Sequence, residues 1–221
     1  MHTTVRSLTP YLLSIAVLHS SLSFAHSEID TGERATFISN TEVELPKNFR
    51  SWTHVGTFLN PPGSITILDG STVKGGMFAN TYVEPTALAA FKASGKWPDG
   101  TQLIKEFTES DLTGDCDAAS GICKTAVGTG VFQHHYIGAG YMVKDAKRFP
   151  DAPGNWGYFG FGPVSSGAYP QTATLRPQAQ CSACHVENRA EQDYVFSDAH
   201  IGIGQYPENF TTELPAAGKS K

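Results

Sequence analysis

The sequence feature that most constrains this chain is the run CSACH, which places Cys181, Cys184 and His185 close together. Two cysteines separated by two residues and followed directly by histidine form the attachment pattern of a c-type haem. On a helix these side chains stand at positions i, i+3 and i+4 and share one face. Two thioether bonds can then anchor the porphyrin edge while His185 reaches the iron as its axial ligand. The motif therefore predicts one covalently bound haem c on a helix near the C-terminal end.

Two other interpretations of these residues remain open. Cys181 and Cys184 could form a disulfide, which would leave His185 without a role. A zinc ion could use the same three side chains, but it needs a fourth ligand, and the adjacent Cys184 and His185 would be strained as joint ligands. The haem interpretation gives each of the three residues a role.

The N-terminal stretch predicts export from the cytoplasm. Residues 1–25 combine Arg6, an apolar run over residues 11–18 and a small-residue site that ends at Ala25, which is typical of a cleavable signal peptide. The apolar run is too short to cross a bilayer, so we expect no membrane span after cleavage. A periplasmic or secreted location follows, and it agrees with covalent haem attachment, which is usually completed outside the cytoplasm.

The rest of the chain divides into three predicted parts. Residues 26–44 are polar and unpatterned and predict a flexible arm, residues 45–200 predict the haem domain, and residues 201–221 predict a flexible tail. The whole chain has 16 basic and 21 acidic side chains and a net charge of −5. An acidic surface argues against nucleic acid as a partner.

A second pair of cysteines lies in the exported part. Cys116 and Cys123 bracket a short loop, and disulfides persist in oxidising compartments. We expect these two residues to form a disulfide that staples the loop and carries no chemistry. The alternative is a pair of reduced thiols in a flexible loop.

The remaining pattern predicts an α+β fold, with a mainly antiparallel β-sheet, a short helix and a C-terminal haem-bearing helix. Segments that favour strands are separated by turn residues and cover residues 52–59, 81–83, 101–107, 131–143 and 155–161. The fourth segment contains Gly138 and Gly140, so it predicts either one strand or a pair. Residues 86–94 predict a short helix that ends at Gly95.

Residues 101–107 alternate in a way that places a lysine on an apolar face. Leu103, Lys105 and Phe107 would point one way and Ile104 the other, and both faces carry apolar groups. We therefore expect the strand to be covered on both sides. Lys105 would then lie on a mostly apolar face, unless its side chain extends to the edge of the sheet and reaches solvent.

Residues 155–161 predict an aromatic strand with interleaved glycines. Phe159 and Phe161 would share one face, and Trp156 and Tyr158 the other. Such a strand suits packing against a flat macrocycle, and it equally suits an ordinary sheet core. Together with Phe107, these two phenylalanines are the candidate aromatic contacts of the haem.

Several short stretches, in order along the chain, resemble the cytochrome P-460 family. They span about residues 45–197, nearly all of the compact region. They are LPKNFRSWTHVGT (45–57), YVEP (82–85), GKWPDGTQLIKEF (95–107), YIGAGYMVKD (136–145), RF (148–149), PGNW (153–156), CSACH (181–185) and DYVF (193–196).

The resemblance implies a periplasmic haem protein, often a homodimer, whose iron is held by histidine with an open distal face. Enzymatic members oxidise hydroxylamine to nitrous oxide or nitrite, with nitric oxide as intermediate or co-substrate. They pass electrons to an external acceptor, for which we expect a redox partner cytochrome. They also carry a covalent bond from a lysine to the porphyrin, and Lys105 in GTQLIKE stands at the place of that lysine.

The same alignment exposes two departures from the enzymatic members. Those members place an arginine and a glutamate in the distal pocket, and the matching positions here are Ala79 and Gly140. Neither residue can accept a proton. His134 or His135 could substitute, because imidazole titrates near neutral pH, although strand alternation lets only one face the pocket. His135 is the distal candidate that we carry forward, against the alternative of an ordinary surface histidine.

Two other classes of haem protein stay open beside the enzyme. The related cytochromes c-prime-beta lack the cross-link, cap the iron with phenylalanine and bind nitric oxide without turnover of hydroxylamine. A plain electron carrier would need a sixth iron ligand, for which Met77, Met142 and a histidine such as His54 are the candidates.

Overall fold

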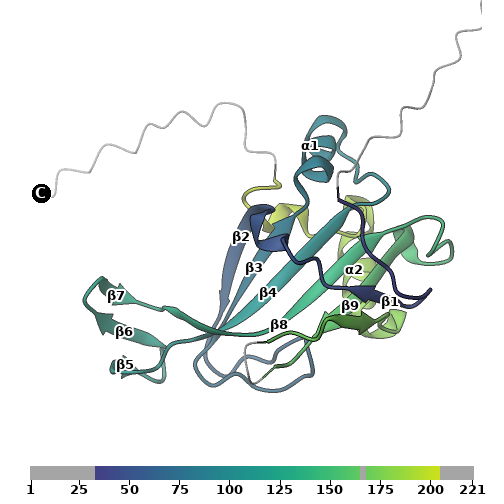
Figure 1. Cartoon of the computed structure of the whole chain (residues 1–221). Helices are drawn as coiled ribbons and strands as arrows, with labels where there is room; N and C mark the ends of the chain where they lie inside the picture. The colour runs from purple at the N-terminus through teal and green to yellow at the C-terminus, as the bar shows by residue number, and fades with distance from the viewer. Residues whose placement is uncertain (1–32, 165–167, 205–221) are drawn as a thin grey trace, which may run out of the picture.

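A five-stranded antiparallel sheet forms the centre of the protein (Figure 1). The computed structural model describes residues 33–164 and 168–204, so the predicted signal peptide and most of the predicted tail lie outside the described residues. The strand order is β2-β3-β4-β8-β9. The strands are β2 (Thr53–Asn60), β3 (Met77–Val83), β4 (Gln102–Ser110), β8 (Gln133–Lys144) and β9 (Trp156–Phe161).

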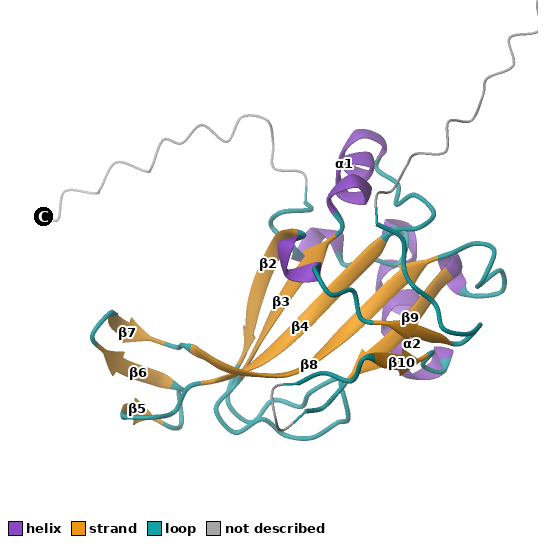
Figure 2. Ribbon diagram, in the orientation of Figure 1, coloured by secondary structure: helices purple, strands orange, loops and turns teal. Residues whose placement is uncertain are grey.

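Two α-helices accompany this sheet (Figure 2). Helix α1 (Pro85–Ser94) begins after Glu84, whose carboxylate accepts hydrogen bonds from two backbone N–H groups of the first turn, and it ends at Gly95, where φ is 72°. Helix α2 (Gln178–Arg189) carries the CSACH motif. The α+β fold class and the C-terminal motif-bearing helix are therefore confirmed. Within residues 33–164 and 168–204, no helix is long and apolar enough to cross a membrane.

Strand β8 is a single strand and not a pair, although it contains two internal glycines. It runs without interruption from Gln133 to Lys144, because β4 pairs along one edge and β9 along the other. The glycine positions leave only a local irregularity, a shift of register opposite Phe107 and Thr108. Hydrogen bonds to two neighbouring strands outweigh the weak strand preference of glycine.

The two faces of the sheet have different covers. The pair β1 (Glu42–Glu44) and β10 (Thr172–Thr174) packs on one face, which we call the β1–β10 face. Segments from α2 and the chain after it pack on the other, which we call the α2 face. Strand alternation places Ile104 on the β1–β10 face, and Leu103 and Phe107 on the α2 face, as the sequence predicts. The segment predicted as an N-terminal arm thus supplies strand β1.

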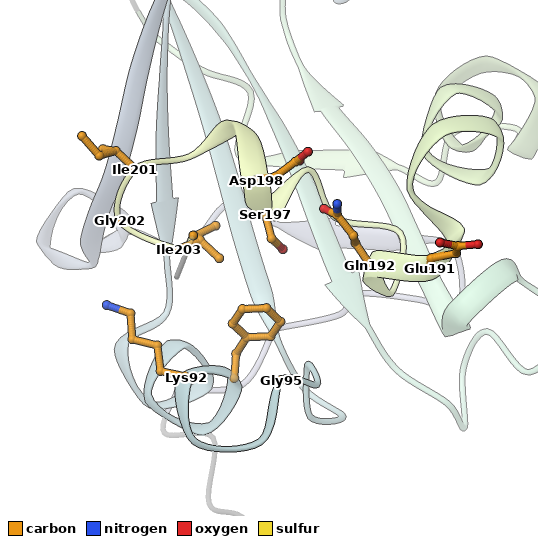
Figure 3. A pocket seen from close by; sticks show the side chains of 11 residues that line it. Lys92, Gly95, Glu191, Gln192, Ser197, Asp198, Ile201, Gly202 and Ile203 are labelled. Atoms are coloured by element: carbon orange, nitrogen blue, oxygen red, sulfur yellow. The ribbon is translucent and has the colours of Figure 1, made fainter. Parts of the chain in front are cut away.

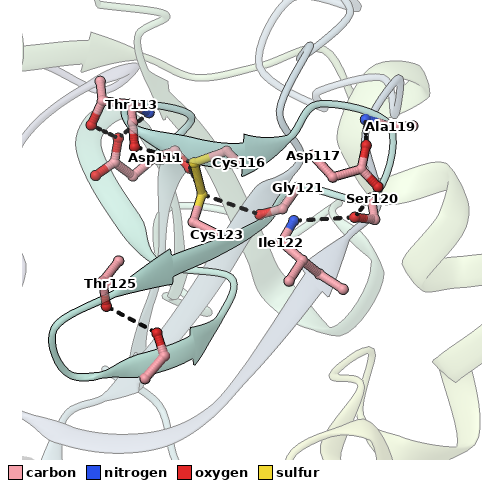
Figure 4. Close-up of a disulfide and its surroundings, with 11 residues drawn as sticks. Asp111, Thr113, Cys116, Asp117, Ala119, Ser120, Gly121, Ile122, Cys123 and Thr125 are labelled. Carbon is pink, nitrogen blue, oxygen red and sulfur yellow. Dashed lines mark hydrogen bonds between the residues drawn. A yellow bond between two sulfur atoms is a disulfide. The ribbon is translucent and has the colours of Figure 1, made fainter.

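A small second sheet extends away from the body of the molecule (Figure 1). It consists of β5 (Asp115–Asp117), β6 (Ile122–Thr125) and β7 (Gly128–Gly130), in a stretch for which the sequence predicted only a loop. Cys116 on β5 lies opposite Cys123 on β6, and their sulfur atoms are 2.07 Å apart, at the distance of a disulfide bond (Figure 4). We call these three strands the disulfide arm.

Four short 3-10 turns complete the described chain. Their bounds are η1 (Phe49–Ser51), η2 (Pro153–Asn155), η3 (Ala190–Gln192) and η4 (Ser197–Ala199). The last two belong to the segment that returns from α2 across the α2 face. A backbone hydrogen bond from the N–H of Gly202 to the carbonyl of Val55, 2.7 Å long, fastens that segment to strand β2.

Candidate haem site

The CSACH residues stand on the C-terminal helix α2. Cys181 is half-buried against the apolar cluster of the α2 face, whereas Cys184 is exposed. Within the described chain neither forms a disulfide, and no group of three or more potential ligands is arranged there to hold a metal ion. The two alternatives of a local disulfide and a zinc site therefore find no support in the arrangement of the motif.

The ring of His185 is held in a fixed orientation. Its Nδ1 atom lies 2.7 Å from the carbonyl oxygen of Tyr194, which can only accept, so Nδ1 carries the proton. The rings of Tyr158 and Phe196 both pack against the imidazole, each with its centroid 5.0 Å from that of the His185 ring. This leaves the lone pair on Nε2, the form in which a histidine binds a metal while its second nitrogen is anchored by a carbonyl.

The surroundings of His185 favour its neutral form. Burial lowers the pKa of the imidazole, the Tyr194 carbonyl raises it, and the ammonium group of Lys105 lowers it again. The neutral ring is the one that ligates iron. A protonated ring would have to lose its proton before ligation.

The turn that supplies the Tyr194 carbonyl is itself fixed by residues far away in the sequence. Asp193 and Tyr194 both have positive φ values, 53° and 61°. The Asp193 carboxylate accepts two bonds from Lys144 Nζ, at 2.5 and 2.6 Å, and its carbonyl accepts one from Trp156 Nε1 at 2.9 Å. A β-carbon on Gly154 would meet the Tyr194 ring at 2.3 Å, so glycine is required there. These contacts orient His185 through Tyr194.

A row of five paired residues crosses the sheet on the α2 face. Gly56 pairs with Thr81, Thr81 with Lys105, Lys105 with Gly140, and Gly140 with Gly160. We call this set the glycine row. Three of its five members have no side chain, so the sheet presents a nearly bare floor around Lys105.

The room above each glycine of this row can be judged from what an added β-carbon would meet. A β-carbon on Gly140 would meet only Phe107, at 4.0 Å, which is ordinary contact. One on Gly160 would lie 2.6 Å from the guanidinium group of Arg176, which crosses the floor at that end. One on Gly56 would lie 3.6 Å from the ring of His200 at the other end. The middle of the row is therefore open, and its two ends are covered by cationic or titratable side chains.

Three polar side chains around the glycine row lack polar partners within the described chain. Lys105 Nζ lies 5.1 Å from the centroid of the Phe58 ring, and within the described residues no carboxylate is close enough to form an ion pair with it. Burial lowers the pKa of Lys105. The hydroxyl groups of Thr81 and Tyr158 are buried without a hydrogen-bond partner among the described residues. Buried polar groups without a hydrogen-bond partner are rare in protein interiors, so these three groups indicate that a further group binds at this face.

These features together fit a haem. A bare floor suits a flat macrocycle, the His185 lone pair is the axial donor that such a group requires, and two thiols stand on the same helix as that histidine. Lys105 occupies the middle of the floor, so the position proposed for a lysine cross-link and the motif-bearing helix belong to one face of the sheet.

The structure separates the three candidate phenylalanines. Phe107 is buried on the α2 face beside the open position at Gly140. Phe159 and Phe161 are buried on the β1–β10 face, in the cluster that includes Tyr141. Their role as haem contacts stays a prediction that this placement does not favour, because the pairing of Gly140 with Gly160 directs their side chains away from Lys105. They belong to the ordinary sheet core.

The two positions that carry polar distal side chains in enzymatic members have none here, which leaves a gap in the distal polar groups. Ala79 is fully buried and pairs with Phe107, and Gly140 belongs to the glycine row. His135 does not fill that gap: its ring is exposed, forms an ion pair with Glu109 at 3.2 Å and contacts His134. His135 is thus placed at the surface end of β8, as the alternative of a surface histidine anticipated.

A surface groove lies close by but is separate from these residues (Figure 3). It has a volume of about 730 Å³ and runs between the end of α1 and the segment after α2. Figure 3 shows Lys92 from α1 on one side, and Ser197, Asp198 and Ile201 on the other. None of the glycine row lines it, so it is a feature of the outer side of the segment that covers the α2 face.

Sequence reasoning missed several residues of this site. His200, Arg176 and the turn at Asp193 and Tyr194 carry no recognisable motif. The glycine row is likewise invisible in the sequence, because its members come from five strands and meet only through pairing. The one available signal was the set of glycines interrupting otherwise β-prone segments.

Comparison with known proteins identifies a family for this chain. The family model described as Cytochrome P460 matches residues 46–197, which is more than half of the 221-residue chain. A comparison with curated proteins found no match. The matched region contains the glycine row, helix α2 and the Tyr194 turn, and the family implies a haem cofactor. The chain belongs to the cytochrome P460 family.

Proposed function

We propose that this protein is an exported c-type cytochrome that carries one haem c and uses it to bind and oxidise hydroxylamine or nitric oxide. Cys181 and Cys184 would bind the haem covalently, and His185 would be its axial ligand. The observation that carries the proposal is the orientation of His185, whose Nδ1 bonds the Tyr194 carbonyl and whose Nε2 is left free on the face that holds Lys105.

Each residue of the site has a distinct part in this proposal. When bound, the haem would supply a redox-active iron with one open coordination position. The Tyr194 carbonyl accepts the Nδ1 proton of His185 and keeps the imidazole oriented, while burial favours the neutral ring by lowering its pKa. The rings of Tyr158 and Phe196 exclude water from that imidazole, and Phe107 covers the floor beside Gly140.

Lys105 is the candidate for a covalent bond to the porphyrin. Its nucleophilic form is the neutral amine, and burial lowers the pKa of the ammonium group, which increases the share of that form. No carboxylate among the described residues holds the ammonium group in place. The partners of the finished protein would be a small nitrogen-oxide ligand or substrate and a redox partner cytochrome that accepts the electrons.

A second candidate function is favoured by Ala79 and Gly140. The two positions that carry an arginine and a glutamate in enzymatic members have no polar side chain here. A haem protein that binds nitric oxide without oxidising hydroxylamine, as the cytochromes c-prime-beta do, would need neither. The electron-carrier alternative depends on a sixth ligand, and both candidate methionines, Met77 and Met142, pack among apolar residues of the α2 face.

The optical spectrum of the purified holoprotein separates these three functions. A Lys105 cross-link predicts a strongly altered visible spectrum that Lys105→Ala returns to that of an ordinary c-type haem. The matched control is Lys124→Ala, whose side chain is 74% exposed on the disulfide arm and which should leave the spectrum unchanged. An ordinary high-spin spectrum with tight nitric oxide binding and no turnover would establish the binding protein instead. A low-spin six-coordinate spectrum would establish the carrier.

Export and assembly complete the proposal. The predicted signal peptide, cleaved near Ala25, would place the protein in the periplasm or outside the cell, where the disulfide between Cys116 and Cys123 would persist. The family resemblance implies a homodimer. N-terminal sequencing of the purified protein and sedimentation at several concentrations would test these two points.

A further inference from the structure

His200 covers one end of the glycine row, and the proposed function gives it no role. It follows η4, just beyond the region matched by the family model. Its side chain is only 5% exposed, and its Nδ1 lies 3.6 Å from the position of a β-carbon on Gly56. Among the described residues the ring has no hydrogen-bond partner. The ring therefore packs on the Gly56 end of the glycine row, whose middle holds Lys105.

One short segment positions both this histidine and His185. Tyr194 supplies the carbonyl that fixes the His185 ring, and Phe196 packs with its edge against that ring. Four residues after Phe196, the backbone N–H of His200 bonds the carbonyl of Ser197 at 3.3 Å, and the chain is then fastened to β2 at Val55. The segment that orients the proposed axial ligand therefore also fixes His200 relative to the floor.

The charges around His200 keep it neutral. Burial is the main cause that lowers its pKa to about 4, and the ammonium of Lys105 on β4 and the ring of His54 on β2 lower it further. Asp198, on the same segment, is the acidic group that raises the pKa. At neutral pH the ring therefore holds one proton and has one nitrogen free to accept another.

We propose that His200 is the proton acceptor for ligands that bind at the open position of the haem site, in the role that Ala79 and Gly140 cannot fill. This inference rests on the proposed haem function. It assigns the role to a residue outside the region that the family model matches. The imidazole takes the proton that the incoming ligand releases and then passes it to water.

Hydrogen cyanide is a suitable probe of this step. It binds ferric haem as the cyanide anion, so each binding event releases one proton and involves no oxidation or reduction. In the proposed step the H–C bond breaks, its electron pair stays on carbon, and the proton moves to the free nitrogen of His200, which becomes an imidazolium. Removal of this acceptor should slow association without preventing it, since water can take the proton less efficiently.

The test compares the cyanide association rate of ferric holoprotein in the unchanged protein and in histidine variants, by stopped-flow absorbance at pH 7. His200→Gln should slow association at least about tenfold relative to the unchanged protein, at the low end of what a positioned acid or base contributes. The matched control is His134→Gln, an exposed histidine of β8, which should not change the rate. Equal rates in His200→Gln and the unchanged protein would overturn the proposal, and so would a slow rate in His135→Gln alone.

A second measurement follows the pH dependence. In the unchanged protein the cyanide association rate should fall as the pH is lowered through the pKa of His200, because an imidazolium accepts no proton. The C–O stretching frequency of the ferrous carbon monoxide form should shift over the same pH range, and the shift should be absent in His200→Gln. A rate and a frequency that stay constant down to pH 3, below the pKa of about 4, would contradict the assignment.

The outcomes also distinguish this inference from the function on which it rests. If His200→Gln holds covalent haem in full amount but binds cyanide as fast as the unchanged protein, only the role of His200 fails. If the unchanged protein itself retains no haem in denaturant, the proposed function fails and the His200 assignment falls with it.

Discussion

The two faces of the central sheet differ in how they accommodate adjacent charged residues of strand β4. Glu106 on one face has polar partners, and Lys105 on the other has none among the described residues. On the β1–β10 face, Glu106 is 1% exposed, and its carboxylate accepts hydrogen bonds from Arg50 at 2.6 Å and Tyr169 at 2.8 Å. On the α2 face, Lys105 has no such partner within the described chain, and the hydroxyls of Thr81 and Tyr158 are buried alone. The buried carboxylate of the β1–β10 face has its partners among the protein's own residues, whereas these three groups of the α2 face find none among the described residues.

This difference indicates which face of the sheet would bind a cofactor. Buried polar groups are normally satisfied, and the protein satisfies those of the β1–β10 face even at the cost of burying a carboxylate. The unpaired groups of the α2 face therefore do not reflect a generally loose interior. Three of them, on Lys105, Thr81 and Tyr158, lie in the glycine row or beside the ring of His185, which is where the proposed haem would lie.

The largest expected effect comes from removing the two attachment thiols. The double variant Cys181→Ser with Cys184→Ser should lose all haem that survives denaturation, because both thioether bonds are gone. Its far-ultraviolet circular dichroism should retain the β-sheet signal, since the core of the β1–β10 face needs no cofactor. The control pair Cys116→Ser with Cys123→Ser should keep its haem. Haem retained by the Cys181 and Cys184 variant on a denaturing gel would refute covalent attachment through the motif.

The next effect concerns the β1–β10 face, where the buried carboxylate of Glu106 has its partners. Glu106→Ala should lower the free energy of unfolding by about 3 kcal/mol, since it leaves the Tyr169 hydroxyl and the guanidinium of Arg50 without their acceptor. The visible spectrum of the haem should not change. Glu109→Ala is the control, because its exposed pair with His135 should be worth less than about 1 kcal/mol. Denaturant titration of the holoproteins measures both, and an equal loss in the two variants would remove the distinction between the faces.

A smaller effect belongs to the disulfide arm, which lies apart from both faces. Removal of the short-loop disulfide by Cys116→Ala with Cys123→Ala should cost roughly 2 kcal/mol or less, because a loop with a sequence separation of 7 restricts the unfolded chain only modestly. Differential scanning calorimetry would measure the loss. We expect the haem spectrum of this variant to stay unchanged. An altered spectrum would show that the disulfide arm affects the haem site.

The smallest effect is a gain of stability from replacing the unpaired lysine. In the haem-free double-serine background, Lys105→Met should raise the free energy of unfolding at pH 7 by about 1 kcal/mol, because it replaces a buried unpaired charge by an apolar side chain. The pKa of Lys105 is lowered in the fold, so the folded state binds fewer protons than the unfolded one.

The sign of the pH dependence follows directly. The stability of the protein that retains Lys105 should rise with pH from the lowered pKa of the folded lysine up to about 10.4, the pKa of an unfolded lysine. The difference in stability between this protein and its Lys105→Met variant should therefore shrink as the pH rises from neutral to about 10. Urea titrations at the two pH values measure it, and a constant difference would show that Lys105 is not desolvated.

Local patterns in the sequence were enough to predict a large part of this structure. The spacing of Cys181, Cys184 and His185 predicted a motif-bearing helix, and alternation predicted that Leu103 and Phe107 share a face opposite to Ile104. Alternation also predicted that Tyr158 and Phe159 lie on opposite faces, which the two clusters confirm. These are properties of one helix or one strand.

The errors arose where two strands or segments must be related to each other. Alternation within β9 could not tell which of its faces shares the side of Lys105, and the pairing of Gly140 with Gly160 places Phe159 and Phe161 on the other side. His135 was considered for its chemistry, and its position at an exposed strand end only appears in three dimensions. His200 reaches the site through a turn that no sequence pattern marks.

The most direct test is peptide mapping of the purified protein by mass spectrometry. We expect the peptide containing Cys181, Cys184 and His185 to carry the mass of one haem, with one such haem per chain. A peptide found with both thiols unmodified, in a protein isolated with its disulfide between Cys116 and Cys123 intact, would contradict the claim that the α2 face is completed by a covalently bound haem.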